Sequence, residues 1–247
     1  MDTFGILGFP LGHSFSKKYF TDKFTEENID ASFLNFELSN IQDFSTVLEQ
    51  HSDLKGFCVT IPYKQDVIQF LDDIDPLAER IGAVNSVRII RENEKVKLVG
   101  YNTDIHGFTE SLRVFLNGKK PKALILGTGG VSKAVATGLE ELSIEYQFVS
   151  RTASHKCISY EMLSKETMSN HHLIVNCTPL GTFPKDDTCP DIPYEYLTKD
   201  HFLYDVVYNP AETLFMKKGA EQGAKTHNGL KMLHLQAERN WAIWNNK

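Results

Sequence analysis

Residues 122–134 read KALILGTGGVSKA, and this stretch decides the fold. Ala123–Leu126 is an apolar run with the length of a buried strand, and helical spacing of apolar residues continues to Leu139. The turn between them holds Gly127, Gly129 and Gly130. Such a strand, glycine turn and helix hold a dinucleotide pyrophosphate, because glycines let the backbone approach the phosphates and free N–H groups at the helix start donate to them. Position 132 is a serine where a full fingerprint has its third glycine, so an ordinary strand–helix turn is the alternative.

Composition excludes several classes of function. The 247 residues suffice for one large domain or two small ones. The net charge is −6, both signs are mixed and there is no basic block, so nucleic acid is not an expected partner. No apolar run approaches the ~18 residues of a membrane span, and the first residues show no secretion signal. The four cysteines form no C-x-x-C pair, so we expect reduced thiols, a cytoplasmic protein and no metal site.

Short apolar runs alternate with helical patterns along the chain, which is typical of α/β architecture. Strands are expected at 4–8, 32–36, 56–59, 87–91, 96–100, 123–126, 146–149, 172–177 and 202–207. Helices are expected at 17–27, 41–50, 65–71, 103–116, 130–139, 211–222 and 228–244. The four-residue turn between 87–91 and 96–100 predicts a hairpin. The polar segment 117–121, with its Gly and Pro, is the clearest boundary in the sequence.

Two serines lie beside the start of the first expected helix. Ser16 is its expected N-cap. Residues two apart in extended backbone face the same way, so the hydroxyls of Ser14 and Ser16 could bind a carboxylate next to the positive end of the helix dipole. A helix cap plus a solvated serine explains the spacing equally well.

Two charged residues, a lysine after a strand and an aspartate at a helix start, stand out in the first half of the chain. Lys64 comes just after the strand at 56–59, close to its carboxyl end. Most lysines are solvated surface groups, so a surface role is the alternative. Asp104 falls in the first turn of the helix at 103–116, where it could simply pair with the helix dipole.

The end of the strand at 146–149 indicates which nucleotide binds. NAD-binding folds carry an acidic residue there that grips the ribose hydroxyls. This chain offers Ser150 and Arg151, with Lys156 close by. A guanidinium binds a 2′-phosphate in a bidentate manner, so the sequence favours NADP over NAD, with an ordinary surface arginine as the alternative. Thr178 opens a loop with Pro and Gly that suits a segment lying along the nucleotide.

Taken together, these segments resemble the shikimate dehydrogenases over nearly the whole chain. The motifs that carry the resemblance are GHSFS at 12–16, VTIPYK at 59–64, GAVNS at 82–86, YNTD at 101–104, GTGGVSKA at 127–134, VNCTPLG at 175–181, YDVVYNP at 204–210 and GLKMLHLQA at 229–237. The resemblance implies reversible, NADPH-dependent reduction of 3-dehydroshikimate to shikimate, on the route to chorismate and the aromatic amino acids. It also implies a substrate-binding domain over 1–101, completed by 229–247, and a Rossmann NADP-binding domain over 102–228 that starts with a linker helix at 103–117.

The resemblance assigns roles residue by residue. Lys64 and Asp104 match the catalytic pair, in which the lysine ammonium protonates the developing alkoxide and the carboxylate orients the lysine. The residues that match substrate ligands, or lie beside them, are Ser14, Ser16, Thr60, Asn85, Tyr208 and Gln236. The expected cofactor contacts are Gly127, Gly129, Gly130, Arg151, Thr152, Lys156, Thr178, Gly229 and Met232.

Four places depart from the family pattern. Lys17 stands where a proline is common, Cys58 where an asparagine is frequent, and Thr182 where a methionine is frequent. Ser150 and His155 replace an asparagine and a second basic residue around position 151, so Lys156 would have to complete the phosphate site.

Two other functions compete with the one that the resemblance implies. A quinate or quinate/shikimate dehydrogenase using NAD would be favoured by an acidic residue at position 151, where this chain has arginine. A relative that binds without catalysis would be favoured by loss of Lys64 or Asp104, and both are present. The expected partner is a small molecule, and the expected state is a monomer or a homodimer.

Overall fold

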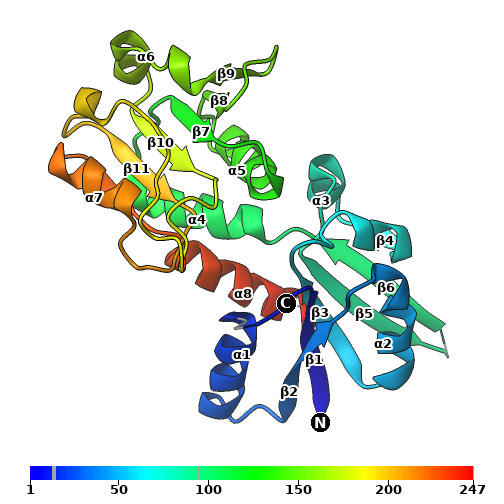
Figure 1. Ribbon diagram of the computed structural model, residues 1–247. Helices are drawn as coiled ribbons and strands as arrows, with labels where there is room; N and C mark the ends of the chain where they lie inside the picture. The colour runs from blue at the N-terminus through cyan, green and yellow to red at the C-terminus, as the bar shows by residue number, and fades with distance from the viewer. Residues whose placement is uncertain (13–14, 94, 247) are drawn as a thin grey trace. The chain divides into compact units, whose positions relative to one another are not determined.

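The computed structural model describes residues 1–12, 15–93 and 95–246. The chain divides into two compact units, which Figure 1 shows in different colour ranges. Unit 1 comprises Met1–Thr103 and Ala237–Lys247, and unit 2 comprises Asp104–Gln236. Each unit is built on its own six-stranded sheet.

The sheet of unit 1 is mixed. Its strands are β1 (Asp2–Gly8), β2 (Ala31–Glu37), β3 (Leu54–Val59), β4 (Asp73–Ile74), β5 (Ser86–Glu92) and β6 (Lys95–Tyr101). They lie in the order β2-β1-β3-β5-β6-β4, with β1 parallel to both of its neighbours. Strands β5 and β6 form the antiparallel hairpin that the sequence predicts, which confirms that prediction.

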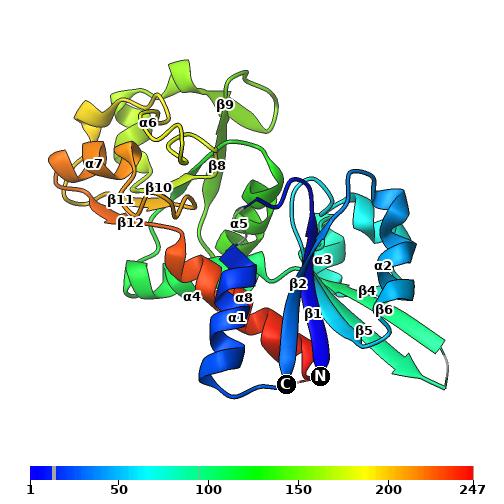
Figure 2. The same cartoon turned by 60° about the horizontal axis from the view of Figure 1, so that its bottom comes forward.

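Helices cover both faces of this sheet. They are α1 (Phe15–Glu26), α2 (Phe44–Gln50), α3 (Pro76–Ile81) and the carboxyl half of α8 (Leu230–Trp244). Two 3-10 turns accompany them, one at Ile41–Asp43, directly before α2, and one at Asp66–Phe70. In Figures 1 and 2, α1 and α8 lie on one side of β1 and β2, and α2 lies on the other. The first side holds an aromatic core in which the rings of Phe4 and Trp244 stack with centroids 5.2 Å apart. The second side is filled by a cluster around Phe44 and Phe57.

Two expectations for unit 1 were wrong in detail. Helix α1 begins at Phe15, so Ser16 lies in its first turn and is not the N-cap; Ser14 lies outside the described residues. The sequence analysis also missed α3, although Asp75 caps it through the Leu77 N–H and Pro76 occupies its first position. A six-residue helix is too short for hydrophobic periodicity to reveal, and only its cap signals mark it.

Unit 2 has the doubly wound parallel sheet that the sequence predicts. Its strands are β7 (Ala123–Leu126), β8 (Tyr146–Ser150), β9 (Cys157–Ser159), β10 (Leu173–Asn176), β11 (Phe202–Asp205) and β12 (Lys225–His227). All pairs of neighbours are parallel, and the order is β12-β11-β10-β7-β8-β9. This is the Rossmann order, in which the direction of winding reverses between the first strand, β7, and the fourth, β10. The predicted fold class is confirmed.

Helices also cover both faces of the second sheet. They are α4 (Asp104–Leu116), α5 (Gly130–Glu141), α6 (Lys165–Asn170), α7 (Leu214–Glu221) and the amino half of α8, with 3-10 turns at Tyr160–Met162 and Tyr194–Tyr196. One core cluster joins α4 and α5 to the sheet, and a second joins α6 and α7 to its other face. The polar segment 117–121 therefore lies inside unit 2, because the apolar face of α4 packs into the core of that unit. Strands β9 and β12 were not predicted, since three residues carry no readable alternation.

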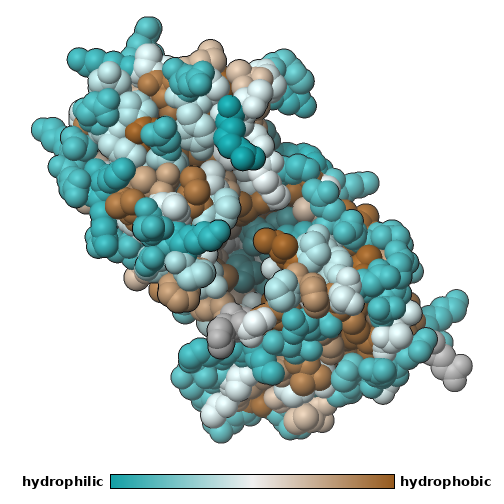
Figure 3. All heavy atoms as spheres, in the orientation of Figure 1, coloured by the Kyte–Doolittle hydropathy of each residue, from teal (hydrophilic) through white to brown (hydrophobic). Residues whose placement is uncertain are grey.

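On the face drawn in Figure 3, hydrophilic side chains predominate and hydrophobic ones lie among them in small groups. Within the described residues, no helix has the length and apolar character needed to cross a membrane.

The aromatic core of unit 1 depends on a glycine in β3. A Cβ at Gly56 would lie 2.3 Å from Cδ1 of Trp244, so the indole would have to move within a filled core. We expect Gly56→Ala to lower the free energy of unfolding by about 1–3 kcal/mol, measured by urea denaturation. The matched control is Lys55→Ala at the adjacent, exposed position, which should change stability by less than ~0.5 kcal/mol. Equal effects of the two variants would contradict the prediction.

Candidate functional site

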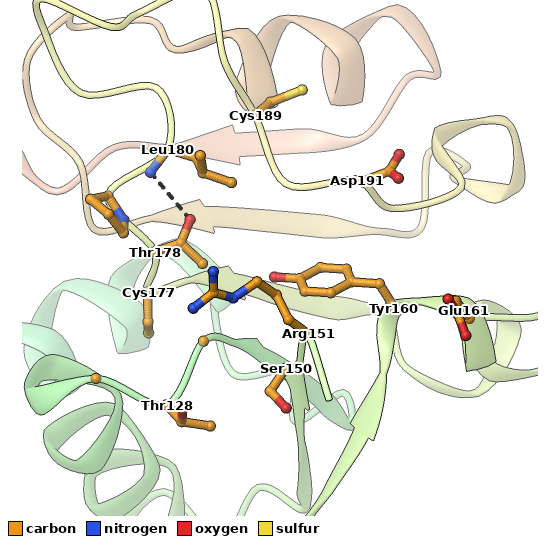
Figure 4. Close-up of a pocket in the computed structure, with 13 residues that line it drawn as sticks. Thr128, Ser150, Arg151, Tyr160, Glu161, Cys177, Thr178, Leu180, Cys189 and Asp191 are labelled. Atoms are coloured by element: carbon orange, nitrogen blue, oxygen red, sulfur yellow. Dashed lines mark hydrogen bonds between the residues drawn. The ribbon is translucent and has the colours of Figure 1, made fainter. Parts of the chain in front are cut away.

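A pocket of about 700 Å³ opens at the carboxyl edge of the unit 2 sheet. Its walls come from the segments that follow three strands: 127–129 after β7, Ser150 and Arg151 at the end of β8, and 177–180 after β10 (Figure 4). Tyr160, Glu161, Cys189 and Asp191 complete the lining. Strands β7 and β10 flank the reversal of winding, where open α/β sheets bind their ligands.

The glycine turn leaves room for a phosphate group. Gly127 has φ +98°, a left-handed conformation that favours glycine, and a Cβ there would meet Cγ2 of Thr178 at 3.1 Å. Gly129 is the N-cap of α5, and a Cβ at Gly129 or Gly130 would meet no atom within 4 Å. The backbone at the start of α5 is therefore open to an approaching anion. Ser132, at the third glycine position, is buried and donates its hydroxyl to the Gly129 carbonyl at 2.6 Å.

A buried polar network supports the opposite wall. The N–H and hydroxyl of Thr178 both donate to Oδ1 of Asn176, at 3.0 and 2.7 Å. Nδ2 of Asn176 donates to Oδ1 of Asp205 at 3.0 Å, and the Thr213 hydroxyl donates to Oδ2 of the same carboxylate at 2.6 Å. The loop that begins at Thr178 is thus tied to the ends of β10 and β11. The sequence analysis missed this support because Asn176 and Asp205 meet only through the pairing of β10 with β11.

Arg151 brings positive charge to the rim of the pocket. Its side chain is exposed, and the hydroxyl of Tyr160 points toward it in Figure 4. Burial raises the pKa of Tyr160, while the nearby Arg151 acts in the opposite direction. Tyr160 therefore remains a neutral hydroxyl at neutral pH, beside a permanent cation. The sequence analysis gave no role to Tyr160, which only the β8–β9 pairing brings to this wall.

The turn that follows Arg151 is held by serine hydroxyls. The Ser150 hydroxyl donates to the Thr152 carbonyl, and the Lys156 N–H donates to the Ser154 hydroxyl at 3.2 Å. The Cys157 thiol contacts the hydroxyls of Ser150 and Ser154, and these hydrogen bonds lower its pKa. Thr152 and Lys156 are exposed on this turn.

Only some of the predicted cofactor residues line the pocket. Those that line the pocket are Gly127, Gly129, Arg151 and Thr178. Those outside its lining are Gly130, Thr152, Lys156, Gly229 and Met232. A Cβ at Gly229 would lie 2.1 Å from the Val206 carbonyl oxygen, so close backbone approach explains that glycine. Met232 is buried in the core cluster of unit 2.

In unit 1, three predicted site residues gather at one end of the sheet. The Val59 N–H donates to the Asn85 carbonyl at 2.8 Å, and the Val84 N–H donates to the Lys64 carbonyl at 2.7 Å. These two bonds lay the segment 60–64 beside Asn85. The Thr60 N–H donates to the Leu7 carbonyl at 2.9 Å, so the same segment also adjoins the carboxyl end of β1. Thr60, Lys64 and Asn85 therefore share the edge of the sheet at the carboxyl ends of β1 and β3.

The remaining predicted residues lie on helices or in a loop. Asp104 is the first residue of α4, and Gln236 lies on α8 with its Cβ 3.2 Å from the point where a Gly107 Cβ would stand. Gly107 is one turn beyond Asp104, so Gln236 packs close to the start of α4. Tyr208 follows β11 and is 39% exposed. The predicted catalytic pair is split, with Lys64 in unit 1 and Asp104 in unit 2.

The glycine turn, the Rossmann strand order and the pocket at the reversal of winding define a dinucleotide-binding α/β protein with a second α/β unit. The profile of the shikimate dehydrogenase substrate binding domain matches residues 6–87. The chain is 34% identical to the NADP(+) shikimate dehydrogenase of Carboxydothermus hydrogenoformans, over 97% of this chain and 90% of that protein. The chain belongs to the shikimate dehydrogenase family.

Solved structures agree with this assignment. Shikimate dehydrogenase 1 from Peptoclostridium difficile is 36% identical, with a TM-score of 0.82 over 100% of this chain and 92% of that one. The enzyme from Thermus thermophilus, solved with NADP(H) and shikimate, is 28% identical, with a TM-score of 0.85 over 100% of this chain and 94% of that one. In the part of the chain that the structure describes, no cluster of His, Cys, Asp or Glu side chains could hold a metal ion.

The carboxylate behind the pocket should make stability depend on pH. Burial raises the pKa of Asp205 from its ordinary 3.8 to about 6, against hydrogen bonds from Thr213, the Val207 N–H and Asn176. Between these two values the folded protein keeps a proton that the unfolded chain releases. The contribution of Asp205 to stability is therefore fully present below pH 3.8 and falls by roughly 3 kcal/mol as the pH rises to about 6.

We expect Asp205→Asn to remove this pH-dependent contribution. The free energy of unfolding of the variant should therefore fall less between pH 4 and 6 than that of the wild type. Urea denaturation at several pH values measures the difference. Asp200→Asn, at an exposed position of the same unit, is the control and should follow the wild-type curve. Parallel curves for Asp205→Asn and the wild type would show that this carboxyl keeps an ordinary pKa.

Proposed function

We propose that this chain is an NADP-dependent shikimate dehydrogenase, which reversibly reduces 3-dehydroshikimate to shikimate in the biosynthesis of chorismate and aromatic amino acids. The observation that carries the proposal is the Rossmann pocket of a shikimate dehydrogenase family member, with Arg151 at its rim. NAD-binding folds hold an acidic residue at that point, which would repel a 2′-phosphate. The quinate dehydrogenase alternative that uses NAD is therefore not favoured.

The residues of unit 2 fit the cofactor. When bound, NADPH supplies the hydride. Gly127, Gly129 and Gly130 let the backbone and the start of α5 meet the pyrophosphate. Arg151 grips the 2′-phosphate, with Thr152 and Lys156 completing the anion site. In the proposal Thr178 lines the path of the nucleotide, and Gly229 and Met232 are assigned to its nicotinamide end.

Unit 1 supplies most of the substrate ligands in this proposal. The hydroxyls of Ser14 and Ser16 bind the carboxylate of the ring. Thr60 and Asn85, which adjoin each other at the ligand-binding edge of the sheet, bind ring hydroxyls. Gln236 and Tyr208, from unit 2, complete the set.

Lys64 and Asp104 handle the proton. Reduction of the C3 carbonyl leaves negative charge on its oxygen, and the Lys64 ammonium donates a proton to that atom. Asp104 orients the ammonium and accepts a hydrogen bond from a substrate hydroxyl. A carboxylate next to an ammonium stabilises its charged form, so Asp104 does not act by lowering the pKa of Lys64.

The assignment of the two domains is part of the same proposal. The substrate-binding domain is residues 1–101 with 229–247, and the NADP-binding domain is 102–228. The cytoplasmic location and the monomeric or homodimeric state that the sequence analysis expects stay predictions. Size-exclusion chromatography coupled to light scattering determines the oligomeric state.

The proposed function is tested by absorbance of the reduced nicotinamide with shikimate plus NADP, then with quinate plus NAD. We expect turnover with the first pair. Lys64→Ala should lower turnover by roughly 10²–10⁴-fold while NADP binding survives, because only proton donation is lost. Lys97→Ala, at an exposed lysine of the same unit, is the control and should turn over like the wild type. Unchanged turnover of Lys64→Ala would contradict the role of Lys64 as the proton donor.

The cofactor assignment gives a separate prediction. Arg151→Ala should raise the KM for NADPH and leave the KM for NADH nearly unchanged, because only NADPH carries the 2′-phosphate. Steady-state kinetics with both nucleotides measure the two effects. Arg113→Ala, at an exposed arginine in the same unit, should alter neither value. Equal increases for both nucleotides would contradict the role of Arg151.

A further inference from the structure

We infer that Asn240, on the C-terminal helix, is a positioning residue for the substrate site. It holds Thr103, and through Thr103 it fixes the carboxamide of Asn85 in the orientation that a ring hydroxyl needs. The inference rests on the proposed function, since it concerns the site that would bind shikimate. All residues of this network belong to unit 1.

The network is a chain of side-chain hydrogen bonds between segments that are distant in sequence. Nδ2 of Asn240 donates to Sγ of Cys58, at the end of β3, at 3.2 Å. The Thr103 hydroxyl donates to Oδ1 of Asn240 at 2.7 Å and lies 3.2 Å from Oδ1 of Asn85. The Thr103 N–H donates to Oδ1 of Asn85 at 2.7 Å. Thr103 therefore contacts both carboxamide oxygens.

The network has little access to water. Cys58 is 5% exposed, Asn85 3%, Thr103 1% and Asn240 0%. A buried amide or hydroxyl without a partner is destabilising, so each group strongly favours the arrangement that satisfies it. Sulfur is a weak acceptor, which makes the short bond between Asn240 and Thr103 the stronger end of the chain.

The geometry fixes which end of the Asn85 amide is available to a ligand. Its Oδ1 accepts from Thr103, so Nδ2, on the other side of the same planar group, faces away from Thr103. The main chain at Asn85 is held as well, because its N–H donates to the Tyr101 carbonyl at 3.0 Å and its carbonyl accepts from Val59. A donor fixed in this way can bind a hydroxyl oxygen without first being ordered.

Loss of Asn240 releases this restraint. The Thr103 hydroxyl then loses its 2.7 Å hydrogen bond to Asn240 and keeps only the longer contact with Asn85 Oδ1, at 3.2 Å. Thr103 then shifts toward Asn85 to shorten that contact, and the Asn85 carboxamide moves with it. The consequence is specific, because affinity for the substrate falls while the nucleotide pocket of unit 2 is untouched. A role limited to packing would lower thermal stability and leave the kinetic constants of the folded enzyme unchanged.

The experiment uses the full-length enzyme and measures KM for shikimate, KM for NADP, kcat and Tm. We expect Asn240→Leu, which keeps the number and branching of the side-chain heavy atoms, to raise the KM for shikimate about tenfold, with kcat and the KM for NADP within about twofold of the wild type. Asn245→Leu is the matched control, since Asn245 is exposed on the following turn, and it should leave all three constants unchanged. Thr103→Val should reproduce the defect and Thr103→Ser should not, because serine keeps the hydroxyl.

A double-mutant cycle tests whether Asn240 acts through Asn85. In an Asn85→Ala background, Asn240→Leu should raise the KM for shikimate no further. The inference is overturned if the KM for shikimate is unchanged in Asn240→Leu and Thr103→Val, or if the effect of Asn240→Leu is fully additive with that of Asn85→Ala. In either case the proposed function still stands, provided that the wild type turns over shikimate. Lack of wild-type turnover with shikimate overturns the proposed function, and the inference with it. If Asn240→Leu does not fold, the two Thr103 variants decide the question alone.

Discussion

The pairing of β7 with β10 is the constraint on which unit 2 depends. Every strand is parallel, and the winding reverses at this pair, so the segments that leave the two strands diverge and cannot fill the edge between them. The glycine turn occupies one side of this edge and the loop from Thr178 the other. Gly127 has a positive φ and no side chain, which lets the two sides lie close together behind the pocket, where an added Cβ would meet Thr178. A nucleotide site is thus a consequence of strand order, and the side chains decide which nucleotide it takes.

Unit 1 builds its site by a different means. Its carboxyl edge is assembled by backbone hydrogen bonds that lay the segment 60–64 beside Asn85, and by a buried polar chain that runs from Asn85 through Thr103 to Asn240. Cys58, where the family has a frequent asparagine, receives the far end of that chain. Both units therefore place polar side chains with fixed direction at one edge of their sheet, and each supports them with buried hydrogen bonds.

Much of the architecture was readable from local signals. Apolar runs and helical spacing identified the long strands and helices, the hairpin of β5 and β6, and the glycine turn before α5. Short elements were missed: α3 is marked only by its caps, and β9 and β12 offer too few residues for a period to appear. The start of α1 was placed too late, because serine is a favourable N-cap and local spacing does not reveal that Ser16 already lies in the first turn.

The sequence by itself determined the α/β class, the glycine turn, the family and the presence of a basic residue just after β8, because each of these depends on residues close together in the chain. Only the tertiary structure decided which of the candidates meet. It brought Tyr160 to the wall beside Arg151, tied Thr178 to Asp205 through Asn176, and joined Asn85 to Asn240. These contacts depend on strand order and on the return of the C-terminal helix to unit 1. No local pattern encodes a contact between residues as distant in the chain as Asn85 and Asn240, which meet through Thr103.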